Sequence, residues 1–176
     1  MPETTIAVKR WSDFTDEDRA GFDALREQIT FGLPPTTWTP MEETPWRVLL
    51  WEDGRLVSHV SVMDRTIQVG GRPVHVAGIR SVMTLPEARG RGYASQLMAR
   101  AAELIPREIP SAEHGLLLCL DIRVPLYSRL GWRVVDAPTY FEQPEGRTRS
   151  QVNTMVKPFK DKPWPAGEVD LCGLPW

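Results

Sequence analysis

The sequence predicts a mixed α/β domain of the α+β kind, in which helices flank a central mixed β-sheet of about six to seven strands. Segments rich in β-formers and joined by Asp-Gly or Gly-Gly pairs predict antiparallel hairpins. A glycine-rich turn in the middle of the chain separates a predicted strand from a predicted helix. The wholly apolar run at 115–120 is typical of a strand buried on both faces. Hairpins on either side of this strand–helix–strand unit make the predicted sheet a mixed one.

The first elements are a strand and a helix. Residues 4–9 alternate weakly and predict a strand. Thr15 and Asp18 form a weak capping-box pattern, and apolar residues then recur on one face, which predicts a helix over 16–29. The proline-rich residues 32–40 predict a long loop, and loops of this length in a small domain are often binding loops.

Antiparallel strands are predicted next. Asp53-Gly54 lies between β-rich runs at 47–52 and 55–62 and is a strong hairpin signal. Gly70-Gly71 marks a second turn, which is followed by a long predicted strand over 74–85. Pro86 ends that strand.

The second half combines helices and strands. Apolar residues at three- and four-residue spacing predict a helix over 94–105. The buried strand at 115–120 follows, and a short helix over 125–130 ends at a glycine. Residues 132–135 and 152–156 complete the predicted strands. Proline- and tryptophan-rich residues 158–176 predict an extended tail that packs on a single domain spanning 1–176.

Composition excludes several classes of function. Lys and Arg number 21 against 23 Asp and Glu, a net charge of −2, which argues against broad nucleic-acid binding. No apolar run is long enough to span a membrane, and the first residues lack a signal-peptide pattern. Two cysteines 53 positions apart make neither a disulfide framework nor a metal site, and Cys119 in its apolar run is expected to be buried and inert. We therefore expect a cytoplasmic protein without a metal.

Chemistry is concentrated in the turn before the predicted helix over 94–105. Gly90 and Gly92 allow the backbone to approach a ligand closely, and N–H groups at a helix N-terminus bind phosphate. Arg89 and Arg91 add positive charge in an acidic protein. The P-loop pattern is absent, and the third small residue of the dinucleotide fingerprint is missing.

The pattern R-x-x-G-x-A at Arg89, Gly92 and Ala94 resembles the acyl-CoA pyrophosphate loop of the GNAT superfamily of N-acetyltransferases, and the order of elements is similar too. The resemblance implies direct transfer of an acetyl group from acetyl-CoA to a primary amine of a small molecule. It also implies a strand at Val82, Met83 and Thr84 that pairs with the pantetheine arm, with the Met83 N–H facing the thioester oxygen. The pyrophosphate-binding residues that it implies are Arg89, Gly90, Arg91, Gly92, Tyr93 and Ala94.

The second half is similar to the aminoglycoside 2′-N-acetyltransferases. The pattern L-Y-x-x-x-G-W around Tyr127 implies that this phenol is the general acid for the departing thiolate; the alternative is a core tyrosine packed on Trp132. The chain ends with a cysteine followed by Trp176, which in the resemblance implies a terminal carboxylate that contacts the acceptor. A tryptophan that only packs on the sheet is the alternative.

Two positions depart from that family. Arg80 stands where members carry a glutamate that binds the amine, and no acidic residue precedes Trp38 in the predicted substrate loop. Arg80 therefore suggests an acceptor with a carboxylate or phosphate near its amine, unless it forms an ion pair inside the protein. Asp121 is the best-placed carboxylate for the acceptor, and His59 or His75 is a candidate proton relay through water.

Three functions remain open on the sequence. The leading one is an N-acetyltransferase that acts on a small amine, with Trp38, Arg80, Asp121 and Trp176 forming the acceptor site. An aminoglycoside-type enzyme or a longer-chain acyltransferase is the first alternative. A non-catalytic module that binds acyl-CoA is the second. The predicted partner is a small-molecule amine, with no nucleic acid or membrane, and dimers are common for this fold.

Overall fold

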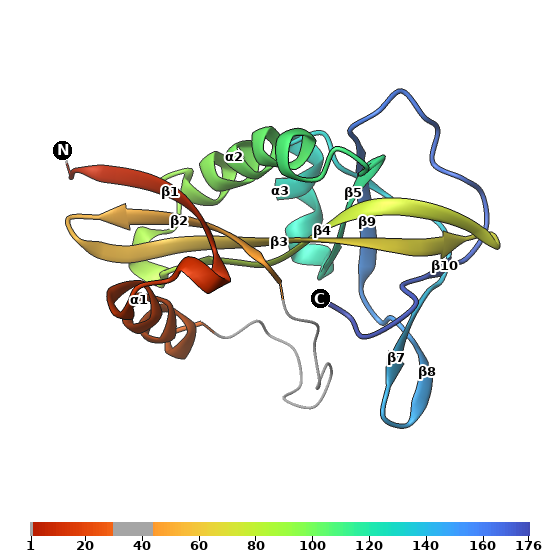
Figure 1. Ribbon diagram of the computed structural model, residues 1–176, viewed down its shortest axis with the longest axis horizontal. Helices are drawn as coiled ribbons and strands as arrows, with labels where there is room; N and C mark the ends of the chain where they lie inside the picture. The colour runs from red at the N-terminus through yellow and green to blue at the C-terminus, as the bar shows by residue number, and fades with distance from the viewer. Residues whose placement is uncertain (1, 30–43) are drawn as a thin grey trace.

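A computed structural model describes residues 2–29 and 44–176, and Figure 1 shows the arrangement of their elements. The helices are α1 (Asp16–Glu27), α2 (Tyr93–Glu108) and α3 (Val124–Arg129), with 3₁₀ turns η1 (Trp11–Asp13), η2 (Pro86–Ala88) and η3 (Asp121–Arg123). The strands are β1 (Thr4–Arg10), β2 (Trp46–Glu52), β3 (Arg55–Val69), β4 (Arg72–Thr84), β5 (His114–Cys119), β6 (Arg133–Val134), β7 (Thr139–Gln143), β8 (Gly146–Arg149), β9 (Asn153–Pro158) and β10 (Val169–Asp170). None of these helices is long and apolar enough to cross a membrane.

All ten described strands join one mixed sheet. Its order is β6-β9-β5-β4-β3-β10-β7-β8, and β2 pairs with β3 and carries β1 at its other side. The β4–β5 and β10–β7 pairs are parallel and the others antiparallel. The mixed sheet is as predicted, but the predicted count of six to seven strands is wrong, because β7, β8 and β10 were missed. These strands have two to five residues, too few for a periodic pattern to show.

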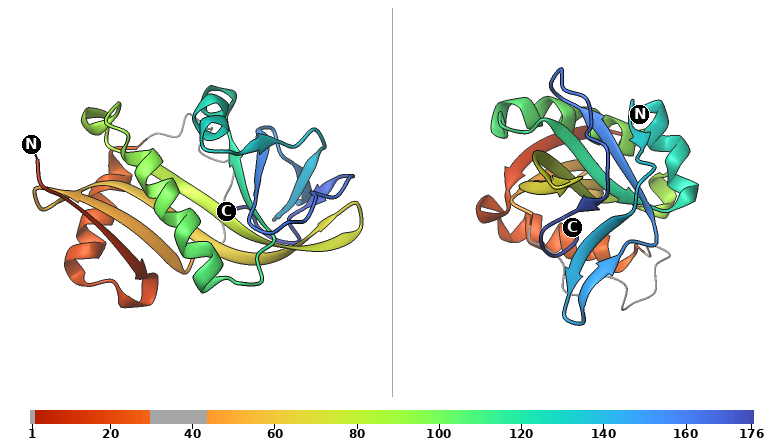
Figure 2. Two further views of the ribbon diagram at one scale, coloured as in Figure 1. Left: turned by 90° about the horizontal axis from the view of Figure 1, so that it is seen from above. Right: turned by 90° about the vertical axis from the view of Figure 1, so that its right-hand side faces the viewer.

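The half of the sheet that contains β1 and β2 lies between two helices. Figures 1 and 2 show α1 and α2 on opposite faces of it. The Thr15–Asp18 capping box that starts α1 is present as predicted, and Phe22 and Leu25 of this helix are buried. Helix α2 buries one apolar face, made of Leu97, Met98, Ala101, Leu104 and Ile105. These side chains and the apolar residues of β2, β3 and β4 form one core cluster.

A second apolar cluster lies at the other end of β3 and β4. It combines the ends of these strands next to the Gly70-Gly71 turn with β10 and the tail, where Leu171 and Trp176 are buried. Strand β3 has 15 residues and β4 has 13, so both run through the two clusters. After β9 ends at Pro158, the regular structure of the tail is the short β10, and buried side chains of the tail belong to this second cluster.

The two parallel strands in the middle of the sheet separate along their length. Strands β4 and β5 pair only from Val76–His114 to Ile79–Leu117. Strand β4 continues to Thr84 and β5 to Cys119 without pairing to each other. The sheet is therefore open between the carboxyl ends of these strands.

Candidate functional site

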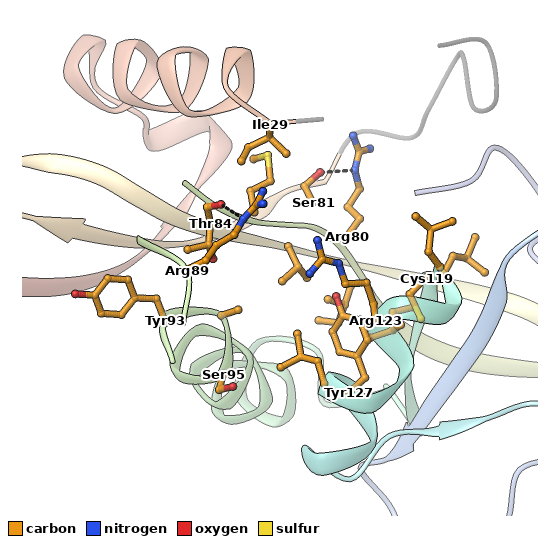
Figure 3. Close-up of a pocket in the computed structure, with 18 of the residues that line it drawn as sticks. Ile29, Arg80, Ser81, Thr84, Arg89, Tyr93, Ser95, Cys119, Arg123 and Tyr127 are labelled. Carbon is orange, nitrogen blue, oxygen red and sulfur yellow. Dashed lines mark hydrogen bonds between the residues drawn. The ribbon is translucent and has the colours of Figure 1, made fainter. Parts of the chain in front are cut away.

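A cleft of about 1190 Å³ lies where β4 and β5 diverge. Its walls come from α1, the end of β4, the turn before α2, the start of α2 and the η3–α3 segment, with Trp176 of the tail as a further lining residue. Figure 3 shows Arg123 and Tyr127 on one side of β4, while the Arg80 and Ser81 side chains extend to the other side of the strand; all four residues line the cleft. Backbone from β4 and side chains from α3 thus meet in one cavity.

The turn into α2 forms one end of the cleft. Gly90 and Gly92 both adopt left-handed backbone conformations, with φ of 79° and 78°, and no heavy atom lies within 4 Å of a Cβ built at either one. Gly92 is the N-cap residue of α2 and has no side chain, so no side chain at this position accepts a hydrogen bond from the first-turn N–H groups. The space, the glycines and the helix N-terminus fit a phosphate group.

The two arginines of this turn behave differently. Arg89 lines the cleft, where its Nε lies 3.3 Å from the Thr84 carbonyl oxygen. Arg91 is outside the described lining and donates to both carboxylate oxygens of Glu52, at 2.7 and 3.0 Å. The Tyr93 hydroxyl also donates to Glu52, and its hydrogen bond with Arg91 and the charge of Glu52 raise the pKa of Arg91. Sequence analysis missed Glu52, which fastens this turn to the β2–β3 hairpin from 39 positions away.

A bulge interrupts β4 beside the cleft. Ser61 pairs with Arg80 and His59 with Met83, so Val60 alone faces both Ser81 and Val82. Ser81 adopts a left-handed conformation with φ of 50°.

The register beyond the bulge orients the backbone. The Leu85 N–H donates to the Val57 carbonyl at 2.9 Å, and His59–Met83 continues the same register two residues on. Both are therefore hydrogen-bonded pairs, and the Met83 N–H points to β3 rather than into the cleft. This register argues against the prediction that the Met83 N–H faces a ligand in the cleft. Because successive N–H groups along a strand point to opposite edges, the Val82 and Thr84 N–H groups point to the edge of β4 that borders the cleft.

Tyr127 lies on α3 with its ring buried and its hydroxyl directed into the cleft. Burial, together with the neighbouring Cys119, raises its pKa well above the ordinary value, so the phenol keeps its proton at neutral pH. Burial likewise raises the pKa of the Cys119 thiol to about 11, in agreement with the expectation of an inert, buried cysteine.

The predicted acceptor residues are only partly brought together. Arg80 and Trp176 line the cleft, and Trp176 is 2% exposed beneath the Arg65 guanidinium. Asp121 is exposed, does not line the cleft and accepts a hydrogen bond from Asn153. Trp38 falls outside the described residues.

Neither of the two histidines proposed as proton relays lines the cleft, although His59 lies behind the lining residues Ser81 and Phe22. His59 is fully buried, and burial and the charge of Arg47 lower its pKa to about 3. His75 lies 3.2 Å from the Ser111 hydroxyl and 3.5 Å from Asp64, on another part of the surface. Neither is placed to take a proton from an amine in the cleft.

The family follows from comparison with known proteins. The sequence profile of the acetyltransferase (GNAT) domain family matches residues 6–135. The chain belongs to the GNAT acetyltransferase family. No match was found among the curated proteins.

Solved GNAT structures share the fold at low sequence identity. The GNAT-family N-acetyltransferase YhbS of Escherichia coli, solved in complex with CoA, is 18% identical over 98% of this chain and 91% of its own, with a TM-score of 0.65. ElaA of E. coli is 15% identical over 89% of this chain and 99% of its own, with a TM-score of 0.62. An acyl-CoA N-acyltransferase from Pseudomonas aeruginosa is 19% identical over 88% of this chain and 99% of its own, also with a TM-score of 0.62. These likenesses concern the fold.

The cleft lining carries an excess of positive charge, although the whole chain has a net charge of −2. The described lining contains six arginine side chains and a single acidic one, Asp23 of α1. Asp23 was missed because the sequence shows it only as one of several polar residues on a helix. No cluster of three or more potential metal ligands occurs in 2–29 and 44–176. The arrangement suits anionic ligands.

Proposed function

We propose that this GNAT chain is an acetyl-CoA-dependent N-acetyltransferase that acts on a primary amine of a small molecule. The observation that carries the proposal is the joining of two features in one cleft: the glycine turn at the N-terminus of α2 and the free edge of β4 beyond Ile79. The first fits a pyrophosphate and the second an extended amide-containing arm.

The cosubstrate would be held mainly by backbone groups. The N–H groups from Gly90 to Ala94 would bind the pyrophosphate, with Arg89 as the adjacent cation. Arg91 and the Tyr93 hydroxyl would act indirectly, because both are bound to Glu52 and fix the turn. The edge of β4 at Val82–Thr84 would pair with the pantetheine arm, which also contains amide groups.

Acetyl-CoA supplies a thioester, at whose carbonyl carbon the amine nitrogen forms a bond while the bond to sulfur breaks. We assign the stabilisation of the developing oxygen charge to the Val82 N–H rather than to that of Met83, since the latter is directed to β3. Tyr127 would donate a hydrogen bond to the departing sulfur. Because the pKa of this phenol lies above that of an ordinary thiol, about 8.5, donation without complete proton transfer is the favoured role.

The amine must lose a proton, and the described lining offers few acceptors for it. Asp23 is the one carboxylate side chain there. It is exposed on α1, so a water chain leading from the cleft past Asp23 to solvent is the simplest route.

Arg80 supports an acceptor that carries a carboxylate or phosphate near its amine, because its side chain reaches the cleft beside Ser81. A polycationic aminoglycoside fits this lining poorly, since six arginines would repel it. The identity of the acceptor and the length of the acyl chain are each open to direct assay. Parallel assays with aminoglycosides, amino acids and aminophosphonates, and with acetyl- and longer acyl-CoA, distinguish these alternatives.

Calorimetric titration with acetyl-CoA tests the proposal, together with release of free thiol when an amine is added. Gly92→Val should weaken binding more than tenfold, since its side chain enters the space assigned to the phosphate. Gly71→Val is the matched control, because Gly71 has φ of 76°, equally open surroundings and a position outside the cleft. Absence of binding to the unmodified protein refutes the proposal. Binding without turnover for any amine favours the non-catalytic module.

Tyr127→Phe separates binding from chemistry. The substitution removes one oxygen from a buried ring that packs in the main core. We expect kcat to fall about 100-fold, within the range for loss of an acid or hydrogen-bond donor, with the acetyl-CoA Kd unchanged. An unchanged kcat would show that Tyr127 is only a packing residue.

A further inference from the structure

Polar residues are buried in β3 directly beside the β4 bulge. Ser58, His59 and Ser61 are each 0% exposed within a strand whose other buried side chains are mostly apolar. The Ser58 hydroxyl donates to the Met83 carbonyl at 2.8 Å, and His59 Nδ1 lies 2.9 Å from the Ser81 carbonyl oxygen. Two side chains of β3 therefore bind backbone of the segment that borders the cleft.

The hydrogen bond of His59 lies where the regular pairing of β3 with β4 is interrupted. Ser81 is the extra residue of the bulge, and its carbonyl accepts from a side chain at the point where the register shifts. Its left-handed conformation is unfavourable for a residue with a Cβ. Such a conformation persists only when its surroundings hold it.

The protonation state of His59 determines which atom donates. The ring is enclosed, with Phe22 at 4.9 Å between ring centroids, and the nearby guanidinium groups of Arg47 and Arg80 oppose a further positive charge. Burial first and these charges second lower the pKa of His59 to about 3, so the imidazole is neutral at neutral pH. A neutral ring that faces a carbonyl through Nδ1 must carry its hydrogen there.

Fixing the Ser81 carbonyl also fixes the next N–H group. The Ser81 carbonyl and the Val82 N–H belong to one planar peptide unit, in which a trans bond points them in opposite directions. With the carbonyl held toward His59 of β3, the Val82 N–H is directed away from β3, toward the edge of β4 that borders the cleft.

We propose that His59 is a positioning residue for acyl transfer: its Nδ1–H holds the Ser81 carbonyl and thereby aims the Val82 N–H at the thioester oxygen. This inference rests on the proposed function. It assigns His59 no proton transfer and no contact with either substrate.

The test compares His59→Leu, which removes the donor, with His59→Asn, whose side-chain amide nitrogen can take the place of Nδ1. His114→Leu is the matched control, since His114 is also a buried strand histidine but packs on Trp164 outside the cleft. We expect His59→Leu to lower kcat about 10- to 100-fold, part of the 10²–10³ lost with an oxyanion donor, and to change the KM for acetyl-CoA less than threefold. His59→Asn should recover most of kcat, and His114→Leu should retain it. Full activity in His59→Leu, or no recovery in a folded His59→Asn, overturns the proposal.

Two further readouts do not depend on activity. In the unmodified protein at pH 7, ¹⁵N NMR of labelled histidine should show His59 neutral with its hydrogen on Nδ1; a hydrogen on Nε2 or a cationic ring overturns the proposal even if no variant folds. Amide hydrogen exchange at 81–84 should be faster in His59→Leu than in His59→Asn or His114→Leu, and equal exchange counts against it. If no amine is acetylated but both readouts give the expected result, the proposed function has failed, whereas the hydrogen bond from His59 to the Ser81 carbonyl is supported.

Discussion

Gly78 offers a sharp test of how the tail forms a wall of the cleft. It sits in the middle of β4, paired with Met63 of β3 on one side and Leu116 of β5 on the other. A Cβ at this position would lie 2.5 Å from Cε2 and 2.6 Å from Nε1 of Trp176, and 3.0 Å from Cγ of Met63. Gly78→Ala therefore drives a methyl group into the indole ring.

The size of the effect follows from the packing. The indole must retreat by roughly 1 Å to restore a contact near 3.5 Å, but Trp176 is 2% exposed and lies under the Arg65 guanidinium at 5.0 Å. Overpacking of this kind costs about 1–3 kcal/mol. For a chain of this length, a loss of 2 kcal/mol lowers Tm by about 4–8 °C. Trp176→Ala alone should cost about 3–5 kcal/mol.

The assay is a double-mutant cycle of urea unfolding at fixed pH. In the Trp176→Ala background, the alanine at position 78 meets vacated space, so its cost should largely disappear and the coupling free energy should reach at least about 1 kcal/mol. Effects that add within about 0.5 kcal/mol would refute the close contact. A Gly78→Ala protein as stable as the parent would refute it too.

Three further predictions concern the glycine turn before α2, a helix cap and the cysteines. Glu52→Gln should weaken acetyl-CoA binding about tenfold in calorimetry by loosening the turn at 86–92; unchanged affinity would contradict this role. Burial of Asp18 opposes its ionisation, but the hydrogen bonds that its carboxylate accepts outweigh burial and lower its pKa. The stability contributed by ionised Asp18 is therefore present above about pH 4 and is lost as pH falls through the folded-state pKa. Asp18→Asn should thus cost about 1 kcal/mol at pH 7 and flatten the loss of Tm between pH 7 and 3; an unchanged acid limb would argue against it. In alkylation at pH 8, exposed Cys172 should react in the native protein and buried Cys119 only after unfolding; the reverse order would contradict the burial.

Local signals in the sequence were enough to predict most of the fold. The capping box of Thr15, the two glycine turns of the hairpins and the apolar period of α2 each act over a few residues, and the structure has all three. Strands β7 and β8 form a local hairpin with each other but are too short for a periodic pattern to show, and β10 was missed because two residues pair with the distant strand β3. Helix α2 extends to Glu108 through Pro106, three residues beyond the prediction.

The candidate site was predictable only where it depends on local backbone. The turn at Gly90 and Gly92 follows from neighbouring residues, and so does its place at the start of a helix. The role of Glu52 could not be predicted from neighbouring residues, because its carboxylate comes from the β2–β3 hairpin. The orientation of the Met83 N–H depends on the bulge at Ser81, and no pattern in β4 marks that residue as left-handed.

The length of β3 and β4 has a consequence for how the molecule unfolds. Each strand contributes side chains to both apolar clusters, and their pairing is continuous from the Gly70-Gly71 turn to the cleft apart from the bulge. One cluster cannot lose its packing without freeing strands that the other needs. Denaturation should therefore be a single cooperative transition, and damage to the tail should be felt at the opposite end of the sheet.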